Sequence, residues 1–338
     1  MVRRSAPLLC LLLAATAQAA PYRAPRTPDG RPDFQGEWTN ATWTPLQRPR
    51  AFKSLTATQA EADTYLRGVL DFLENKEPPR KLGDPPPEPD VGFSEWFDGA
   101  PAFLRLDGGL RSSIIVEPSD GRLPYNAFGR QASRAAFQRD ETGMDGPEDR
   151  SGEERCLVAL SSMTGAPMLP SGYNGHYRIV QTPGAVAIES EMIHDVRLVR
   201  MGATHDGGAA RWGGDSVGRW EGETLVVETV GQHPVEAERF IGPAVMLITP
   251  GARVTERFTR TGPTEIRYAF EVDDPAVYSR PWRGELRFTA TDAPMYEYAC
   301  HEGNHALPNI LAGARRTEAD AKAAADKAKA VPAKSKAE

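Results

Sequence analysis

The chain has 338 residues, of which 40% are hydrophobic and 25% are charged, and its formal net charge is −6 at pH 7. A chain of this length and composition can fold around a sizeable hydrophobic core, as one large domain or two small ones. The acidic balance argues against a basic nucleic-acid-binding surface, so we expect no nucleic-acid partner.

The N-terminus has the features of a cleavable signal peptide. Arg3 and Arg4 precede an apolar run over 8–15, and Ala17-Gln18-Ala19 supplies the small-x-small pattern that signal peptidase reads. The apolar run is far shorter than the roughly 20 residues that span a bilayer. We therefore expect a periplasmic or secreted protein, cleaved near Ala19, with no transmembrane segment.

The first element that the mature chain predicts is a helix over 57–75. Thr58 and Glu61 form a capping-box pattern, and apolar residues follow at helical spacing. The stretch over 77–89 then contains two proline runs, which exclude helix and central strand. It predicts an extended strap over the surface, or a linker.

From about residue 112, short runs rich in β-branched and aromatic residues alternate with Gly, Pro and Asp turns. The predicted strands are 112–117, 177–182, 185–189, 196–201, 219–221, 224–230, 254–259, 265–272, 284–289 and 296–300. Turns roughly ten residues apart favour a mainly β protein with an antiparallel up-and-down barrel, similar to a lipocalin. A β-sandwich is the alternative.

These elements divide the chain into four parts: a signal peptide over 1–19, an N-terminal extension over 20–111, a barrel-like domain over 112–316 and a tail over 317–338. The tail consists almost entirely of Ala, Lys, Asp and Glu, with Pro332 interrupting it. Because it lacks an apolar face, we expect a frayed helix or a disordered segment.

Two cysteines remain after removal of the signal peptide, which carries Cys10. In an oxidising compartment Cys156 and Cys300 can close into a disulfide, and two buried free thiols are the alternative. If the disulfide forms, it closes a long loop and stabilises the fold.

Four motifs resemble those of a large group of exported bacterial proteins of uncharacterised activity. The motifs are DGRPDFQGEWTN at 29–40, MIHDVR at 192–197, GRWEGETLVV at 218–227 and YEYACHEGN at 296–304. The resemblance covers the chain from about 29 to 316 and implies export and a shared fold, without implying an activity.

A weaker resemblance links the chain to lipocalin-like barrels, whose first strand begins with a Gly-x-Trp element. Gly36-Glu37-Trp38 is similar to this element, and Gly218-Arg219-Trp220 repeats its form. An indole that packs across a barrel end against a close backbone needs a glycine nearby.

The segment from His301 to His305 matches the zinc-binding pattern H-E-x-x-H. That pattern binds zinc when a helix places both imidazoles on one face. Gly303 and Asn304 are poor helix formers, and Pro308 follows closely. We therefore predict no metal site here.

Residues suited to acid–base chemistry form a better candidate site, with His194, His301 and Glu302 as predicted catalytic residues. Glu191 and Asp195 lie beside His194, but strand alternation would place His194 on the opposite face. The predicted disulfide would hold His301 and Glu302 in a defined place. The alternative is that His194 bonds to a backbone carbonyl and the acids pair with arginines.

Arginine and aromatic side chains form a candidate ligand-binding set. Its members are Arg197, Arg219, Trp220, Tyr278, Arg280, Trp282 and Tyr298. In a barrel mouth, rings stack on a planar ligand while a guanidinium binds an anionic group. Trp220 and Trp282 can equally be core residues.

The sequence lacks the motifs of a P-loop, a dinucleotide-binding turn, a serine-hydrolase elbow and a C-x-x-C redox pair. We expect no cofactor. The leading hypothesis is a barrel that binds a small, partly apolar or aromatic organic ligand. The alternative is a lyase, isomerase or hydrolase that uses His/Glu acid–base chemistry, and the third is a structural or partner-binding envelope protein.

Overall fold

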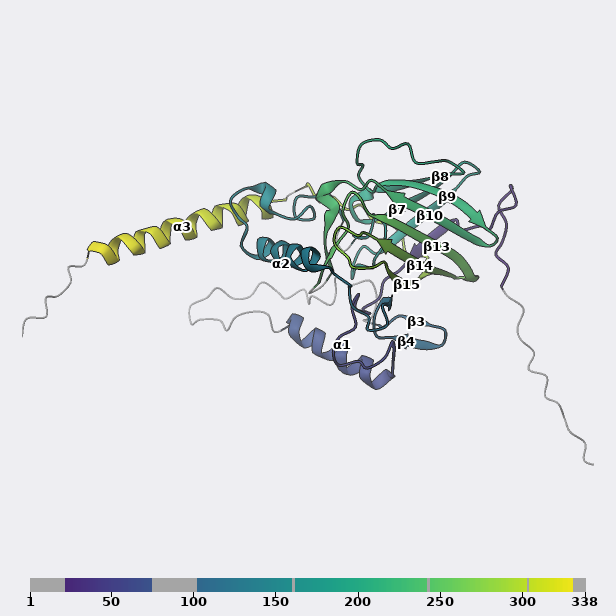
Figure 1. Ribbon diagram of the computed structural model, residues 1–338, viewed down its shortest axis with the longest axis horizontal. Helices are drawn as coiled ribbons and strands as arrows, with labels where there is room; N and C mark the ends of the chain where they lie inside the picture. Colours follow the sequence, from purple (N-terminus) through teal and green to yellow (C-terminus); the bar gives the residue numbers. More distant parts are fainter. Residues whose placement is uncertain (1–21, 75–101, 160–161, 242–243, 303, 331–338) are drawn as a thin grey trace, which may run out of the picture.

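The fold is built around a β-barrel, with the described helices outside it (Figure 1). The computed structural model describes residues 22–74, 102–159, 162–241, 244–302 and 304–330. The described barrel strands are β1 (Gly36–Thr39), β6 (His176–Gln181), β7 (Ala185–Ser190), β8 (Val196–Met201), β9 (Asp215–Glu221), β10 (Thr224–Val230), β13 (Arg253–Gly262), β14 (Glu265–Asp273) and β15 (Trp282–Ala290). The remaining strands are β2 (Thr56–Ala57), β3 (Arg105–Leu106), β4 (Gly109–Arg111), β5 (Ile115–Glu117), β11 (Glu238–Ile241) and β12 (Ala244–Leu247).

The barrel closes because β1 pairs with both β6 and β15. The predicted barrel is therefore confirmed in preference to the sandwich, but its strands are mixed in direction. β8 and β9 run parallel, since the connection over 202–214 returns the chain along the barrel before β9 begins. The other barrel pairs are antiparallel, as predicted.

Most of the predicted barrel strands are present, but the short strands β2, β3, β4, β11 and β12 were not predicted, and the predicted strand 112–117 is shortened to β5, outside the barrel. The run 296–300 is irregular chain between β15 and α3 (Ala306–Ala330), so that predicted strand is wrong. β1 comes from the range expected to be an N-terminal extension, yet it completes the barrel. Its four residues are too few for periodicity alone to distinguish them from a loop.

Trp38 of β1 is buried, and polar contacts hold its indole. Its indole Nε1 donates to the Phe34 carbonyl at 2.9 Å, and the Arg260 guanidinium lies 5.2 Å from its ring centre. Gly36 has φ +129° and lies against the indole. A side chain at Gly36 would strain the backbone there.

The barrel interior is packed with side chains. Rings from different strands contact one another inside it, as in the pairs Tyr268–Phe288 at 5.5 Å between β14 and β15 and Tyr177–Phe288 at 5.3 Å between β6 and β15, measured between ring centres. Inward-facing residues with no exposed surface are Tyr177, Val199, Val227, Val254, Ile266, Tyr268, Val272, Trp282, Leu286 and Phe288. A cavity that admits water would leave such walls exposed to it, so these side chains enclose no ligand space.

One end of the interior is sealed by the segment 162–170, which we call the plug. Met163, Met168 and Leu169 of the plug are almost fully buried. The Met168 backbone N–H donates to the Tyr268 hydroxyl at 2.8 Å. Arg239, also buried, donates to Ser162 and to the Ala166 carbonyl. The plug is therefore anchored to the barrel by both apolar packing and hydrogen bonds.

α1 (Gln59–Glu74) confirms the predicted helix and its cap. The Thr58 N–H donates to Glu61 Oε2 at 2.8 Å, and the Glu61 N–H donates to Thr58 Oγ1 at 3.2 Å. A small core around Phe52 and Phe103 lies between α1 and the three-stranded sheet of β2, β4 and β3. The predicted proline-rich strap lies outside the described residues.

α2 (Ala127–Thr142) was not predicted, because it is largely polar and contains Gly129. Asn126 caps it by accepting from the Gly129 N–H at 2.8 Å, and the helix packs on β12. α3 extends away from the barrel, and its second half, from the predicted tail, is exposed (Figure 1). None of the described helices is long and apolar enough to cross a membrane.

Candidate functional site

A pocket of about 260 Å³ lies at the barrel end where β7 passes to β8. We call it the His194 pocket. Its lining residues are Cys156, Ile193, His194, Glu297, Tyr298, Ala299, Cys300, His301 and Glu302. The structure thus brings all three predicted catalytic residues, His194, His301 and Glu302, to one pocket from two distant parts of the chain.

Three tethers hold the segment after β15 against the barrel and shape the pocket. The Tyr296 N–H donates to Glu191 Oε1 at 3.0 Å, and the Tyr298 N–H donates to His194 Nε2 at 3.2 Å. The predicted disulfide between Cys156 and Cys300 is present and joins residues 144 positions apart. These tethers place irregular chain where the sequence predicted a strand.

Strained backbone is concentrated at the same pocket. Ile193 has φ +66°, His194 has φ +55° and Cys156 has φ +55°. The left-handed region costs an L-residue about 1–2 kcal/mol, and a β-branched side chain such as that of Ile193 rarely adopts it. Such residues persist only where surrounding contacts fix them, and they cluster at functional sites.

Because of this strained turn, the alternation of side chains along a strand does not predict on which side His194 lies. The residues between β7 and β8 form a short helical turn, Met192–His194, instead of continuing the strand. Glu191 is buried and lies 2.8 Å from His176 Nδ1, while Asp195 is half-buried. Burial raises the pKa of Asp195, and a hydrogen bond from Thr164 of the plug partly opposes that shift.

The contacts of His194 set its chemical role. Because Nε2 accepts the Tyr298 N–H, the neutral imidazole carries its proton on Nδ1 and can donate it to a molecule in the pocket. Burial raises the pKa of the Tyr298 hydroxyl. Burial also raises the pKa of the neighbouring Tyr173 to about 12. Both hydroxyls therefore stay protonated near neutral pH.

His301 and Glu302 are exposed at the pocket. Within the described residues, neither side chain is hydrogen-bonded to another protein group, so both can accept a proton from a bound molecule. His305 of the H-E-x-x-H pattern precedes α3 and is not one of the pocket-lining residues. No three His, Cys, Asp or Glu side chains in the described ranges are grouped to bind a metal ion.

The predicted ligand-binding set does not assemble into one site. Arg197, Tyr278 and Trp282 are buried in the core, while Arg219 and Arg280 are exposed. Trp220 lies beside the β9–β10 turn, 5.7 Å from the Phe34 ring, whereas Trp282 begins β15 at the other barrel end. Tyr298 alone of the seven lines the His194 pocket.

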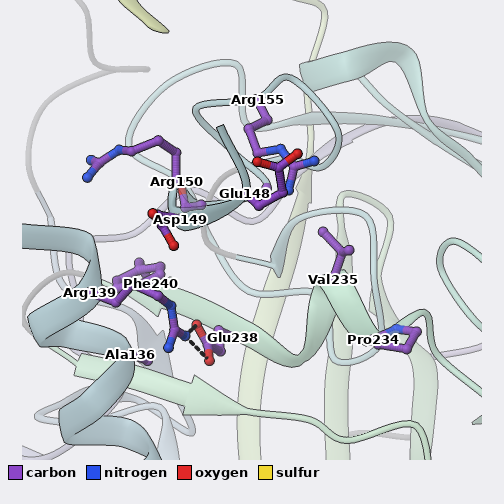
Figure 2. Close-up of a pocket in the computed structure, with 12 residues that line it drawn as sticks. Ala136, Arg139, Glu148, Asp149, Arg150, Arg155, Pro234, Val235, Glu238 and Phe240 are labelled. Atoms are coloured by element: carbon purple, nitrogen blue, oxygen red, sulfur yellow. Dashed lines mark hydrogen bonds and ion pairs between the residues drawn. The ribbon is translucent and has the colours of Figure 1, made fainter. Parts of the chain in front are cut away.

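A second hollow, of about 280 Å³, lies between α2 and β11 (Figure 2). Two of its three arginines are already paired: Arg139 with Glu238, and Arg150 with Glu154 at 2.7 Å. The third, Arg155, also lines the hollow. This hollow could not be predicted from sequence, because its residues come from α2, from β11 and from loops without a motif. We favour the His194 pocket because it brings together side chains from distant parts of the chain and contains strained backbone.

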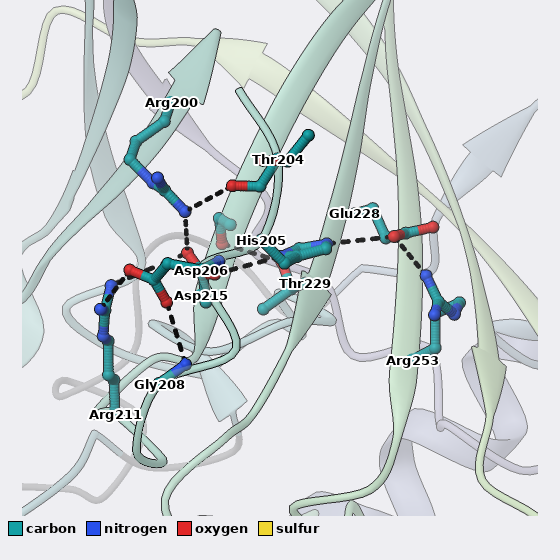
Figure 3. A network of polar contacts seen from close by, with 11 residues as sticks. Arg200, Thr204, His205, Asp206, Gly208, Arg211, Asp215, Glu228, Thr229 and Arg253 are labelled. Carbon is teal, nitrogen blue, oxygen red and sulfur yellow. Dashed lines mark hydrogen bonds and ion pairs between the residues drawn. The ribbon is translucent and has the colours of Figure 1, made fainter. Parts of the chain in front are cut away.

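The described chain also contains a histidine with two carboxylate partners (Figure 3). His205 Nδ1 lies 3.2 Å from Asp215 Oδ2, and Nε2 lies 3.0 Å from Glu228 Oε1. Arg200 binds Asp215 at 2.7 Å, and Arg253 binds Glu228. Both imidazole nitrogens are occupied, so this network anchors the 202–214 connection. No sequence motif marked it.

Comparison with known proteins assigns no family to the chain. No protein-family model, curated protein or solved structure matches it.

Proposed function

We propose that the protein is exported and that the His194 pocket is an acid–base site for a small organic molecule. One observation carries the proposal: two imidazoles and two carboxylates from separate segments line a pocket whose walls include three residues with left-handed backbone. Backbone strain of this kind is retained where a particular side-chain placement is needed.

The geometry supports a division of roles within the pocket. His194, held through Nε2, offers its Nδ1–H as a hydrogen-bond donor to the substrate, and the Tyr298 hydroxyl can serve as a second donor. His301 or Glu302 accepts the proton that the substrate loses. A fixed hydrogen-bond donor in the same pocket as an exposed proton acceptor suits a lyase or isomerase, in which the acceptor removes a proton and the donor stabilises the negative charge that develops on the substrate.

The pocket volume limits the substrate. About 260 Å³ lies just below the roughly 300–1,000 Å³ typical of pockets for drug-sized ligands. We therefore propose a metabolite-sized molecule with hydrogen-bonding groups. The sequence predicted a ligand inside the barrel. Because the barrel interior is filled by side chains, we propose that the ligand binds at the barrel end instead.

Ligand binding without turnover is the second candidate function. The hydrogen bond between the Tyr298 N–H and His194 Nε2 favours it, because a histidine held in this way is a fixed hydrogen-bond donor and a poor base. Membership of the exported bacterial family remains part of the proposal and is supported by the four motifs between 29 and 304.

Untargeted mass spectrometry of small molecules retained by the native protein tests occupancy of the pocket. We expect wild-type protein and His305→Gln to retain the same compound, and His194→Ala and His301→Gln to lose it. His305→Gln is the matched control, because it removes a nearby imidazole that does not line the pocket. Equal retention by all four proteins would place the ligand elsewhere.

A further inference from the structure

The disulfide between Cys156 and Cys300 forms part of the wall of the His194 pocket. Its two sulfurs differ in environment: Cys156 is 4% exposed, whereas Cys300 is half-exposed. A thiolate approaching from solvent therefore reaches Cys300 more easily than Cys156. Which sulfur is attacked, and which leaves, determines the rate of thiol–disulfide exchange.

The surroundings of Cys156 suit a departing thiolate. The Asn304 Nδ2–H donates to Cys156 Sγ at 3.2 Å. The imidazole of His301 lines the same pocket, and its protonated form stabilises a nearby thiolate. Glu297 and Glu302 also line the pocket and oppose this effect, so the amide donor and the His301 imidazole have to outweigh two carboxylates.

We propose that the Cys156–Cys300 disulfide is a thiol-exchange site that oxidises small thiols. The thiolate of a small thiol attacks Cys300 Sγ, a new sulfur–sulfur bond forms there, and the Cys156–Cys300 bond breaks with Cys156 leaving as the thiolate. A second small thiolate then attacks the mixed disulfide and releases the oxidised small disulfide. Two thiols lose two electrons, the protein disulfide gains them, and the two thiol protons pass to the cysteines.

This activity does not depend on the proposed acid–base function, since it needs no substrate in the pocket beyond the thiol. It has a structural consequence for the same site. Reduction removes the covalent tether at Cys300 and leaves the hydrogen bonds at Tyr296 and Tyr298 to hold the segment.

Glutathione is the probe for the test. The oxidised protein is treated with glutathione in neutral buffer, free thiols are trapped by alkylation, and the adduct is located by peptide mass mapping over a series of sub-denaturing urea concentrations. We expect the adduct on Cys300 and a rate that is unchanged by low urea. An adduct on Cys156, or a rate that rises steeply with urea as for a bond reached only by unfolding, would overturn the proposal.

Variants of the amide donor complete the test. Asn304→Ala should slow the exchange about ten-fold, because a hydrogen bond to a charged group is lost as the thiolate departs. Asn304→Asp should slow it at least as much. Asn309→Ala is the matched control, since Asn309 is exposed on α3 and does not line the pocket. Equal rates for Asn304→Ala and Asn309→Ala would contradict the role of Asn304 and the proposal with it.

Discussion

The guanidinium of Arg197 lies inside the barrel, with Nη1 2.7 Å from Glu256 Oε2 and Nη2 3.1 Å from Glu256 Oε1. The Tyr268 hydroxyl donates to the same carboxylate at 2.7 Å. Both members of the ion pair are almost fully buried. Arg197 therefore belongs to a polar core that the plug seals, and it is not available to a ligand.

Removing one partner of this pair should be costly. Glu256→Leu leaves the Arg197 charge buried without a counter-ion, so we expect the free energy of unfolding to fall by about 3–5 kcal/mol. Arg197→Met should be similarly destabilising. The double variant should recover most of the loss, because it leaves no unpaired charge. Urea denaturation of the four proteins measures the coupling, and strictly additive losses would contradict the buried-pair description.

Gly284 should not tolerate a side chain. A Cβ on Gly284 would lie 2.3 Å from Phe270 Cζ, on the neighbouring strand. Gly284→Ala should lower the free energy of unfolding by about 1–3 kcal/mol, as overpacking does in a filled core. In the control, Gly262→Ala, the added Cβ would come no closer than 3.6 Å to Glu265 Cβ. Equal denaturation midpoints for the two variants would show that the interior can adjust.

The backbone at His194 predicts a difference between two inactivating variants. Both His194→Asn and His194→Ala lose the imidazole, but asparagine tolerates φ +55° better than alanine. We expect His194→Asn to be the more stable by about 0.5–1 kcal/mol, with pocket function lost in both. Thermal or urea unfolding checks the order. The reverse order would argue against left-handed strain at this position.

The His205 network predicts acid sensitivity. Burial acts to raise the pKa of Asp215 and of Glu228, but hydrogen bonds from Arg200 and His205 to Asp215, and from Arg253 and His205 to Glu228, outweigh it and leave both values below their usual range. A carboxyl with a lowered pKa contributes stability above its unfolded value, and loses that contribution as the pH falls through its folded value.

We therefore expect the free energy of unfolding to drop as the pH falls below about 4, the ordinary range of these carboxyls. The drop should be smaller in Asp215→Asn and Glu228→Gln than in the wild type. Urea titrations at several pH values measure it. The same pH dependence in all three proteins would exclude the network as its source.

Much of the barrel could be predicted from sequence because its strands are regular. In β8, buried and exposed residues alternate, and β10 contains a continuous run of buried residues. Both strands have the predicted bounds. The parallel pairing of β8 with β9 could not be predicted, since it depends on where the 202–214 connection lies in space. Trp282 illustrates a second limit, because periodicity does not distinguish a packed interior from a ligand-lined one.

The candidate site was only partly predictable. His194, His301 and Glu302 were predicted from sequence as acid–base candidates, and the structure places all three at one pocket. The Cys156–Cys300 pairing followed from the even cysteine count. The left-handed turn at Ile193 left no signal in the sequence, yet it determines how His194 meets the segment after β15. Long-range tethers of this kind are visible only in three dimensions.

Deuterium incorporation is the most direct test of the acid–base claim. Wild-type protein, Glu302→Gln, His301→Gln and the control His305→Gln are each incubated with a small-molecule extract in deuterated water, and the mixtures are compared by mass spectrometry. We predict that, in the mixtures with wild type and with His305→Gln, one compound gains deuterium from the solvent or is converted to a product. In the mixtures with Glu302→Gln and with His301→Gln, that compound should stay unchanged. Identical mixtures from all four proteins would contradict acid–base chemistry at the His194 pocket.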